Sequence, residues 1–221
     1  MTIDDVLHLR PRFWNFHRDL IGSRDSAAYT ILTIHWNLCI GTIARFLESR
    51  PDLSKLLADL EAFHIRGEFM LTELDHGLDA RCIETMATLL PDGTFDLHTP
   101  HPGASKAMQS STPQLETTRV AVVFARLVVD EEDYGVKPFI VYLNEFNQMC
   151  PGILSQQLPR RPGARPMDNA TTSFNHVRLG PGALLGKLEK TSPLTERTEF
   201  SNTSSALRLQ RSLYLWAAFL S

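Results

Sequence analysis

The sequence predicts an α+β protein with N-terminal helices, then antiparallel β-strands, then a short C-terminal helix. Residues 27–48 contain no proline and carry apolar side chains on nearly every face, which indicates a buried helix. From residue 67, runs rich in Val, Ile, Thr and Phe alternate with turn residues, as in strands. Residues 213–220 form an apolar run, which predicts a helix that either docks on the core or is the start of a missing segment.

Composition narrows the class of protein. The chain has 221 residues, enough for one large or two small domains, with 43% hydrophobic and 21% charged residues. A net charge of −3 argues against a nucleic-acid binder that relies on electrostatics. The longest apolar run has eight residues, whereas a membrane-spanning helix needs about 20. Three widely spaced cysteines favour free thiols in a reducing, intracellular compartment.

Two helices are predicted before the strands. The first covers residues 27–48 and ends before Pro51, because the residue preceding a proline is pushed out of the helical region. The second follows at once, since Leu53, Leu56, Leu57, Leu60 and Phe63 recur at helical spacing.

Six strands are predicted after the helices, at residues 68–74, 83–90, 94–98, 119–129, 138–143 and 171–179. Pro91-Asp92-Gly93 predicts a hairpin turn between the second and third strands. The acidic run 130–135 could bind a cation, but a solvated turn is the preferred interpretation. Residues 151–166, with four prolines and three arginines, predict an irregular surface loop rather than a phosphate site.

Common catalytic and cofactor motifs are absent from the sequence. It contains no dinucleotide fingerprint, phosphate loop or hydrolase nucleophile elbow. His98 and His101 lack nearby further ligands, so no metal site is predicted. The segment that stands out is 67–79, a strand that leads into a polar, glycine-containing turn. By pattern alone it is an ordinary strand exit.

Several segments resemble, in chain order, the acyl-CoA dehydrogenase and acyl-CoA oxidase family of flavoproteins. Residues 69–73 (Phe-Met-Leu-Thr-Glu), with His76-Gly77 after them, are similar to that family's Met-Thr-Glu segment and glycine turn. Later segments resemble strands of the family's middle domain, namely 83–88, 95–100 and 174–179. The match runs from about residue 28 to 186. Within the family, the sequence most resembles acyl-CoA dehydrogenase-like proteins of filamentous fungi, which are often tied to secondary metabolism.

The resemblance implies a domain organisation. The family has a helical N-terminal domain, a middle β-barrel and a C-terminal helical domain. We therefore expect a partial N-terminal helical domain at 1–66, a middle β-barrel domain at 67–186, and a C-terminal remnant with a linker and an apolar helix at 187–221. About 35 residues are too few for a four-helix domain, so the chain resembles a truncated member.

The resemblance also implies chemistry. FAD is the expected cofactor and an acyl-CoA thioester the expected substrate, which family members desaturate between the α and β carbons. The residues carried over for cofactor binding are Thr72, Glu73, Leu74, Gly77 and Ser110. Lys106 and Met108 are carried over for substrate binding. Of these, Thr72 would contact the pyrimidine edge of the flavin, and Gly77 would admit a close approach of the backbone.

Two departures from the family pattern keep a second function open. Leu78 stands where the family has serine, and residues 106–110 lack the aromatic residues of the flavin-facing loop. No glutamate is assigned as the catalytic base. The alternatives are therefore an acyl-CoA dehydrogenase or oxidase, and a truncated, non-catalytic binding or interaction module. The oligomeric state stays open, with a homo-oligomer as one outcome. So does the location, peroxisome or cytoplasm, because the final Phe-Leu-Ser is not a Ser-Lys-Leu signal.

Overall fold

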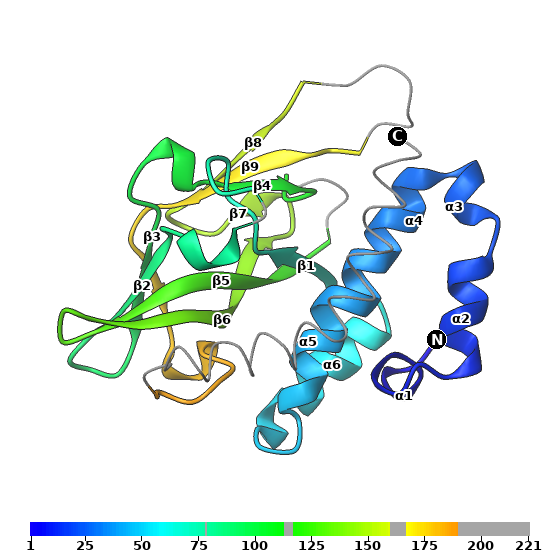
Figure 1. Ribbon diagram of the computed structural model, residues 1–221, viewed down its shortest axis with the longest axis horizontal. Helices are drawn as coiled ribbons and strands as arrows, with labels where there is room; N and C mark the ends of the chain where they lie inside the picture. Colours follow the sequence, from blue (N-terminus) through cyan, green and yellow to red (C-terminus); the bar gives the residue numbers. More distant parts are fainter. Residues whose placement is uncertain (78, 113–116, 160–166, 190–221) are drawn as a thin grey trace.

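The structure is a computed structural model that describes residues 1–77, 79–112, 117–159 and 167–189. Part of the predicted loop at 151–166 and the whole of the predicted C-terminal helix lie outside the described residues. Helices occupy one side of the molecule and strands the other (Figure 1). The predicted fold class, N-terminal helices before a curled, mostly antiparallel sheet, is confirmed. The domain boundaries stay a prediction.

Nine helical segments in the described part of the chain precede the first strand. They are α1 (Ile3–Leu7), α2 (Pro11–Arg18), α3 (Ile21–Arg24), α4 (Ser26–Thr33), a π-helix (Ile34–Ile40), α5 (Gly41–Ile43), a 3₁₀ turn (Ala44–Phe46), a second 3₁₀ turn (Pro51–Leu53) and α6 (Ser54–Glu61). The segments from α4 to Phe46 run on without a break, which confirms the predicted first helix. Asp25 caps this helical stretch, because its side chain accepts a hydrogen bond from the Ala28 amide.

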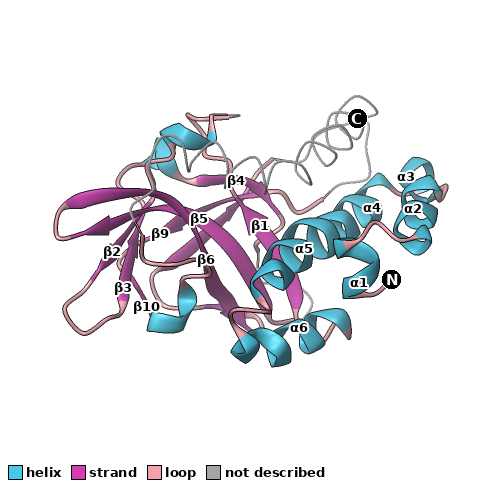
Figure 2. Ribbon diagram, turned by 60° about the horizontal axis from the view of Figure 1, so that its bottom comes forward, coloured by secondary structure: helices cyan, strands magenta, loops and turns pink. Residues whose placement is uncertain are grey.

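The helical stretch Ser26–Phe46 is long and apolar enough to cross a membrane, the one such helix in the part of the chain that the structure describes. However, 67% of its most apolar window is buried inside the protein. Every side chain of the π-helix is buried, and the stretch packs along β1 (Arg66–Met70), as Figure 2 shows. Its apolar character is therefore accounted for by packing against the strands.

The strands form two sheets. The larger contains β1, β2 (Met86–Leu89), β3 (Phe95–His98), β5 (Arg119–Val129), β6 (Glu132–Glu145), β7 (Gln148–Met149) and β10 (Val177–Leu179). The smaller has the order β4 (Lys106–Gln109), β9 (Ala170–Phe174), β8 (Ile153–Gln157). Most pairs are antiparallel, but β1 and β2 both pair with β5 in parallel. Short 3₁₀ turns lie at Ala80–Cys82, Pro102–Ala104 and Pro181–Ala183.

All six predicted strands overlap observed ones, with three corrections. The predicted strand 171–179 is two strands, because the chain turns at His176, which has a φ of +53°. Residues 106–110, predicted as a loop, contain β4, and 151–166 contains β8, so neither segment is wholly irregular. The hairpin at Pro91-Asp92-Gly93 is confirmed by the antiparallel pairing of β2 with β3.

The acidic run joins β5 to β6 through a two-residue turn. Asp130 and Glu131 have φ of +49° and +65°, and Val129 pairs with Glu132. Positive φ at both central positions is the geometry of a type I′ hairpin turn. The turn is exposed, as predicted. Among the described residues, no cluster of three or more His, Cys, Asp or Glu side chains could hold a metal ion.

Two apolar clusters lie on opposite faces of β5. Val120, Val122 and Phe124 pack toward the helices, in a cluster with residues of the stretch 26–46. Ala121, Val123, Ala125 and Leu127 pack toward the second cluster, with residues of β3, β6 and β9. Because side chains alternate along a strand, one strand serves both clusters.

Candidate functional site

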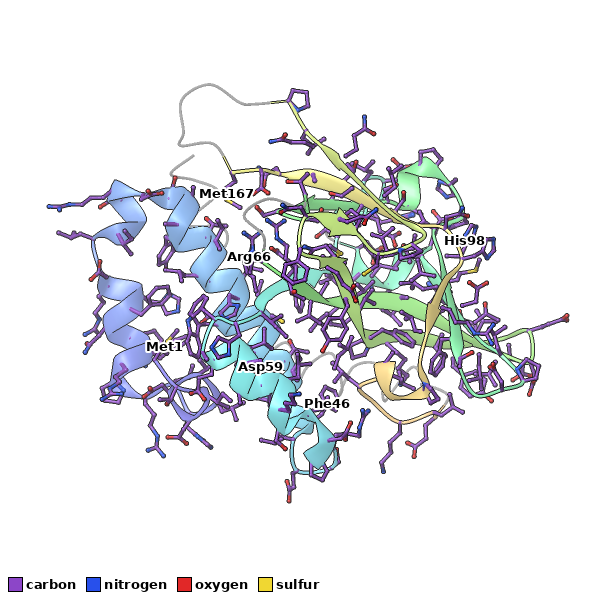
Figure 3. All side chains as sticks on the ribbon, turned by 180° about the vertical axis from the view of Figure 1, so that it is seen from behind. Met1, Phe46, Asp59, Arg66, His98 and Met167 are labelled. Carbon is purple, nitrogen blue, oxygen red and sulfur yellow. The ribbon has the colours of Figure 1, made fainter. Side chains whose placement is uncertain are left out.

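The candidate site lies where the chain leaves β1. Residues 71–75 run antiparallel beside 103–107 and are held by backbone hydrogen bonds. The amide of Ala107 donates to the Thr72 carbonyl (3.0 Å), and that of Leu74 donates to the Ser105 carbonyl (3.1 Å). The segment therefore continues in the direction of β1 and is held by these bonds rather than being a free loop. Residues 72–77 are called the rim. Figure 3 labels Arg66, at the start of β1, near the junction of helices and strands.

Thr72 is the half-buried member of this rim whose polar groups are available. Its carbonyl is occupied, but within the described residues neither its hydroxyl nor its amide has a recorded hydrogen bond. Leu74 is 50% exposed, and Gly77 is exposed with no atom within 4 Å of the place where a Cβ would stand.

Glu73 and Lys106 form an ion pair whose two side chains are both 0% exposed (2.9 Å). The other donors to the Glu73 carboxylate are the amides of Glu84 (2.8 Å) and Thr85 (3.0 Å). Burial alone would raise the pKa of Glu73, but Lys106 and these donors lower it, so the carboxylate is ionised. Burial lowers the pKa of Lys106 to about 8, against the attraction of Glu73.

The geometry of this pair bears on two predicted contacts. The Glu73 carboxylate joins the rim to residues 84–85 and to β4, and the Lys106 ammonium points to Glu73 rather than to solvent. Neither charge is presented to a ligand in this conformation. The assignments of Glu73 to cofactor and Lys106 to substrate stay predictions.

Ser110 follows directly after β4 and is fully buried. Its carbonyl accepts hydrogen bonds from Arg66 (2.5 Å) and Arg119 (2.6 Å). Its hydroxyl has no hydrogen-bond partner among the described residues. Buried hydroxyls are normally satisfied, so this one fits a position where a bound group supplies the partner. Met108 lies within β4.

The predicted cofactor residues lie on two neighbouring stretches of the chain, and their role stays a prediction. Ala107 pairs with Thr72, and Ser110 lies three residues further along the chain, past an irregularity in β4 between Ala107 and Gln109. Unpaired donors at Thr72, an orphaned hydroxyl at Ser110 and open space at Gly77 fit a group with hydrogen-bonding edges. The two glutamates at this rim, Glu73 and Glu84, are both engaged with other protein groups.

Sequence reasoning missed a contact beside the rim. The Glu84 carboxylate lies between two imidazoles, with His76 Nε2 at 2.6 Å from one oxygen and His101 Nε2 at 3.0 Å from the other. The sequence offered His76 as part of the glycine turn and His101 as half of a weak metal pair. Nothing in the spacing of these three residues indicated that they meet.

The chain is similar to known acyl-CoA oxidases. No protein-family model matches the chain. Acyl-coenzyme A oxidase 3 of Yarrowia lipolytica is 36% identical over 179 residues, which are 78% of this chain and 25% of that protein. Peroxisomal acyl-coenzyme A oxidase 1 of Arabidopsis thaliana is 32% identical over 172 residues, 75% of this chain and 25% of that protein. The chain thus spans about a quarter of the length of these curated relatives.

Solved structures give the same result. Acyl-CoA oxidase 1 of Yarrowia lipolytica superposes with a TM-score of 0.69 at 28% identity, over 85% of this chain and 28% of that one. Acyl-CoA oxidase 1 of Arabidopsis thaliana gives 0.62 at 26% identity, over 87% and 32%. Acyl-CoA oxidase-1 of Caenorhabditis elegans, solved in complex with FAD and ATP, shares the fold with a TM-score of 0.60 at 24% identity.

Proposed function

The chain belongs to the acyl-CoA oxidase family, and from that premise we propose that it takes part in FAD-dependent α,β-desaturation of an acyl-CoA thioester. The observation that carries the proposal is the rim after β1. There the similarity to the oxidases coincides with unpaired donors at Thr72 and an orphaned hydroxyl at Ser110. Because the chain spans about a quarter of its relatives, the activity of a whole oxidase is inferred and not observed.

The residues of the candidate site have distinct proposed roles. FAD, when bound, would supply the hydride acceptor. Thr72 would donate to the polar edge of the ring, and Gly77 would let the ring approach the backbone without a Cβ in the way. Ser110 would donate its buried hydroxyl from the end of β4. Leu74, half exposed beside Thr72, would exclude water from the ring.

Lys106 and Met108 are proposed to lie on the substrate side of the site. In this structure the Lys106 ammonium is held by Glu73. Only the position of Lys106 in β4 therefore supports that role. The named relatives act on acyl-CoA, and one is called peroxisomal. These names support an acyl-CoA substrate and a peroxisomal or cytoplasmic location. A homo-oligomer and a role in secondary metabolism are carried only by the original resemblance.

A second candidate function is a non-catalytic flavin- or acyl-CoA-binding module. The specific observation in its favour is that Glu73 and Glu84 are both bound by other protein groups. Neither carboxylate is then free to remove a proton from a substrate carbon. The two functions share a cofactor site and differ in turnover.

The test is flavin titration of purified chains, followed by the change in FAD fluorescence. Gly77→Leu is the informative variant, because its side chain would enter open space and leave the fold intact. We expect it to weaken FAD binding by about tenfold or more with no loss of thermal stability. Gly180→Leu, at another glycine with open space around it, is the matched control and should bind as the unmodified chain does.

Equal FAD affinities of the two variants would contradict the proposed site. No FAD binding by the unmodified chain, at flavin concentrations up to the solubility limit, would contradict a flavin function for this chain. With FAD bound, reduction of the flavin on addition of an acyl-CoA would favour the enzyme over the binding module.

A further inference from the structure

Glu84 joins three segments that are distant in sequence. Its carboxylate contacts His76, in the polar turn after the rim, and His101, at the start of the 3₁₀ turn Pro102–Ala104. Its own amide donates to Glu73, the buried carboxylate of the rim. Glu84 therefore links a partly buried imidazole (His76) and an exposed one (His101) to the buried ion pair that supports Thr72.

The two segments that Glu84 bridges are also in close backbone contact. The amide of Asp75 donates to the Gly103 carbonyl (3.0 Å). A Cβ at Gly103 would stand only 1.9 Å from a carboxylate oxygen of Asp75, so the Asp75 side chain lies directly against this glycine. The hydroxyl of Thr85 donates to the carbonyl of Ala104 (3.0 Å) and closes the same contact from inside.

We propose that Glu84, His76 and His101 form a proton-dependent clasp, which holds residues 75–77 and 79–85 against residues 101–104 and so positions the rim from Thr72 to Gly77. In this arrangement Glu84 is a positioning residue, because it acts on the rim through Glu73 and the two imidazoles. Only the last step, from rim to cofactor, rests on the proposed function. The clasp itself is a property of the fold.

Other charges face the clasp and set its local field. The carboxylates of Asp75 and Glu73, in addition to that of Glu84, raise the pKa of His101. Asp79 lies in the same loop, and its carboxylate accepts a hydrogen bond from the thiol of Cys82. The basic groups nearby are Arg81; Arg126, whose guanidinium holds the carbonyls of Arg81 and Ile83; and Lys106, which is taken up by Glu73. The acids favour a protonated imidazole at the clasp.

The clasp is strongest in a defined pH window. Glu84 raises the pKa of His101 above its usual 6.5, so the contribution of that pair is complete below this value and is lost as the pH rises through the raised pKa. The two histidines lower the pKa of Glu84 below its usual 4.5, so its contribution is present above this value and is lost as the pH falls through the lowered pKa. The clasp is therefore complete between about pH 4.5 and 6.5.

Hydrogen–deuterium exchange of residues 75–77 and 79–85 measures the clasp directly, in the full chain and without cofactor. Protection factors are compared at about pH 5.5 and about pH 8.5. We expect protection to fall by about threefold at the higher pH, as for partly exposed ion pairs. In Glu84→Gln, which keeps the shape but not the charge, protection should be low and equal at both values. In Glu84→Asp, the shorter side chain cannot reach both imidazoles, so protection should be intermediate.

Glu48→Gln is the matched control, because Glu48 is an exposed glutamate with no recorded partner. It should behave as the unmodified chain does. Proton titration of the His101 ring by NMR gives the second readout, and its pKa should fall in Glu84→Gln. Equal protection at both pH values in the unmodified chain, or an unchanged His101 pKa in Glu84→Gln, would overturn the clasp.

Flavin binding separates the clasp from the proposed function. If the clasp positions a flavin rim, FAD affinity should weaken by about threefold from pH 5.5 to 8.5 in the unmodified chain, and should not change in Glu84→Gln. A chain that shows the exchange result but binds no FAD at either pH would retain the clasp and lose the flavin function. A chain that binds FAD with no pH dependence in exchange would lose the clasp and retain the flavin function.

Discussion

His35 shows how one buried side chain can join three elements. Its Nδ1 accepts a hydrogen bond from the amide of Gly67 in β1 (2.9 Å), and its Nε2 donates to the carbonyl of Leu60 in α6 (3.0 Å). The ring is 0% exposed and stacks on Phe63, with centroids 4.2 Å apart. Since Nδ1 must accept, the imidazole is neutral, and burial lowers its pKa to about 4.

Stability should therefore depend on pH through His35. Between pH 6.5 and about 4 the unfolded chain binds a proton that the folded chain does not, so the free energy of unfolding falls as the pH is lowered. The loss reaches up to about 3 kcal/mol. Urea unfolding at pH 7 and at about 4.5 measures it. His35→Gln, which can still accept and donate, should lose most of this pH dependence, and an unchanged slope would contradict the assignment.

The buried ion pair makes an asymmetric prediction. Lys106→Met leaves the Glu73 carboxylate buried without its cation and should destabilise the fold by about 3–5 kcal/mol. The double variant Lys106→Met with Glu73→Gln should recover at least half of that loss, because no unpaired charge remains. Thermal unfolding of the three chains measures both effects. A double variant as unstable as the single would show that the methionine fails to pack.

For single residues, the resemblance pointed to positions in the sequence but not to the side chains that these residues contact. The resemblance singled out Thr72 and Gly77; the structure shows Thr72 half-buried and Gly77 exposed, and their role at a cofactor stays a prediction. It also singled out Glu73 and Lys106 as separate contacts, whereas they bind each other. Side-chain pairing between residues 33 positions apart depends on how two strands pack, and no local pattern encodes that.

Among the elements, the sequence identified strands whose residues alternate or branch and missed strands that rely on partners. β5 was predicted with its observed bounds, because Arg119–Val129 is an almost unbroken β-branched and apolar run. β8 was missed, since Ile153–Gln157 lies among prolines and is mostly polar. Its five antiparallel pairs with β9 form it instead. The parallel pairing of β1 with β5 was also invisible, as it depends on tertiary packing.

Packing of the helical stretch on β1 depends on Gly67. A Cβ there would lie 2.6 Å from the Sγ and 2.8 Å from the Cβ of Cys39, which is fully buried. Gly67→Ala should therefore separate helix and strand and destabilise the fold by about 1–3 kcal/mol. Gly180→Ala, where nothing stands within 4 Å, should have almost no effect. Guanidinium unfolding compares the two, and equal stabilities would contradict the close approach.

Over the whole molecule, β5 connects the two apolar clusters. Val122 belongs to the cluster shared with the helices, and Val123 belongs to the cluster shared with β3, β6 and β9. Because both faces of β5 share one backbone and one set of ladder hydrogen bonds, loss of packing in one cluster should weaken the strand that serves the other. Residues on both sides of the predicted boundary at residue 66 pack in one apolar cluster, and the boundary itself stays a prediction.

Helices and strands should consequently unfold in one transition. Trp36, buried in the helical stretch, reports on the helices by fluorescence in a chain with Trp14→Phe and Trp216→Phe, and far-UV circular dichroism reports on the whole. The two urea curves should coincide. Val122→Ala and Val123→Ala should each shift both curves together, by about 2 kcal/mol. If Val123→Ala moved the dichroism curve and left the Trp36 curve in place, the helical part would be a separate folding unit, as a true domain boundary at residue 66 requires.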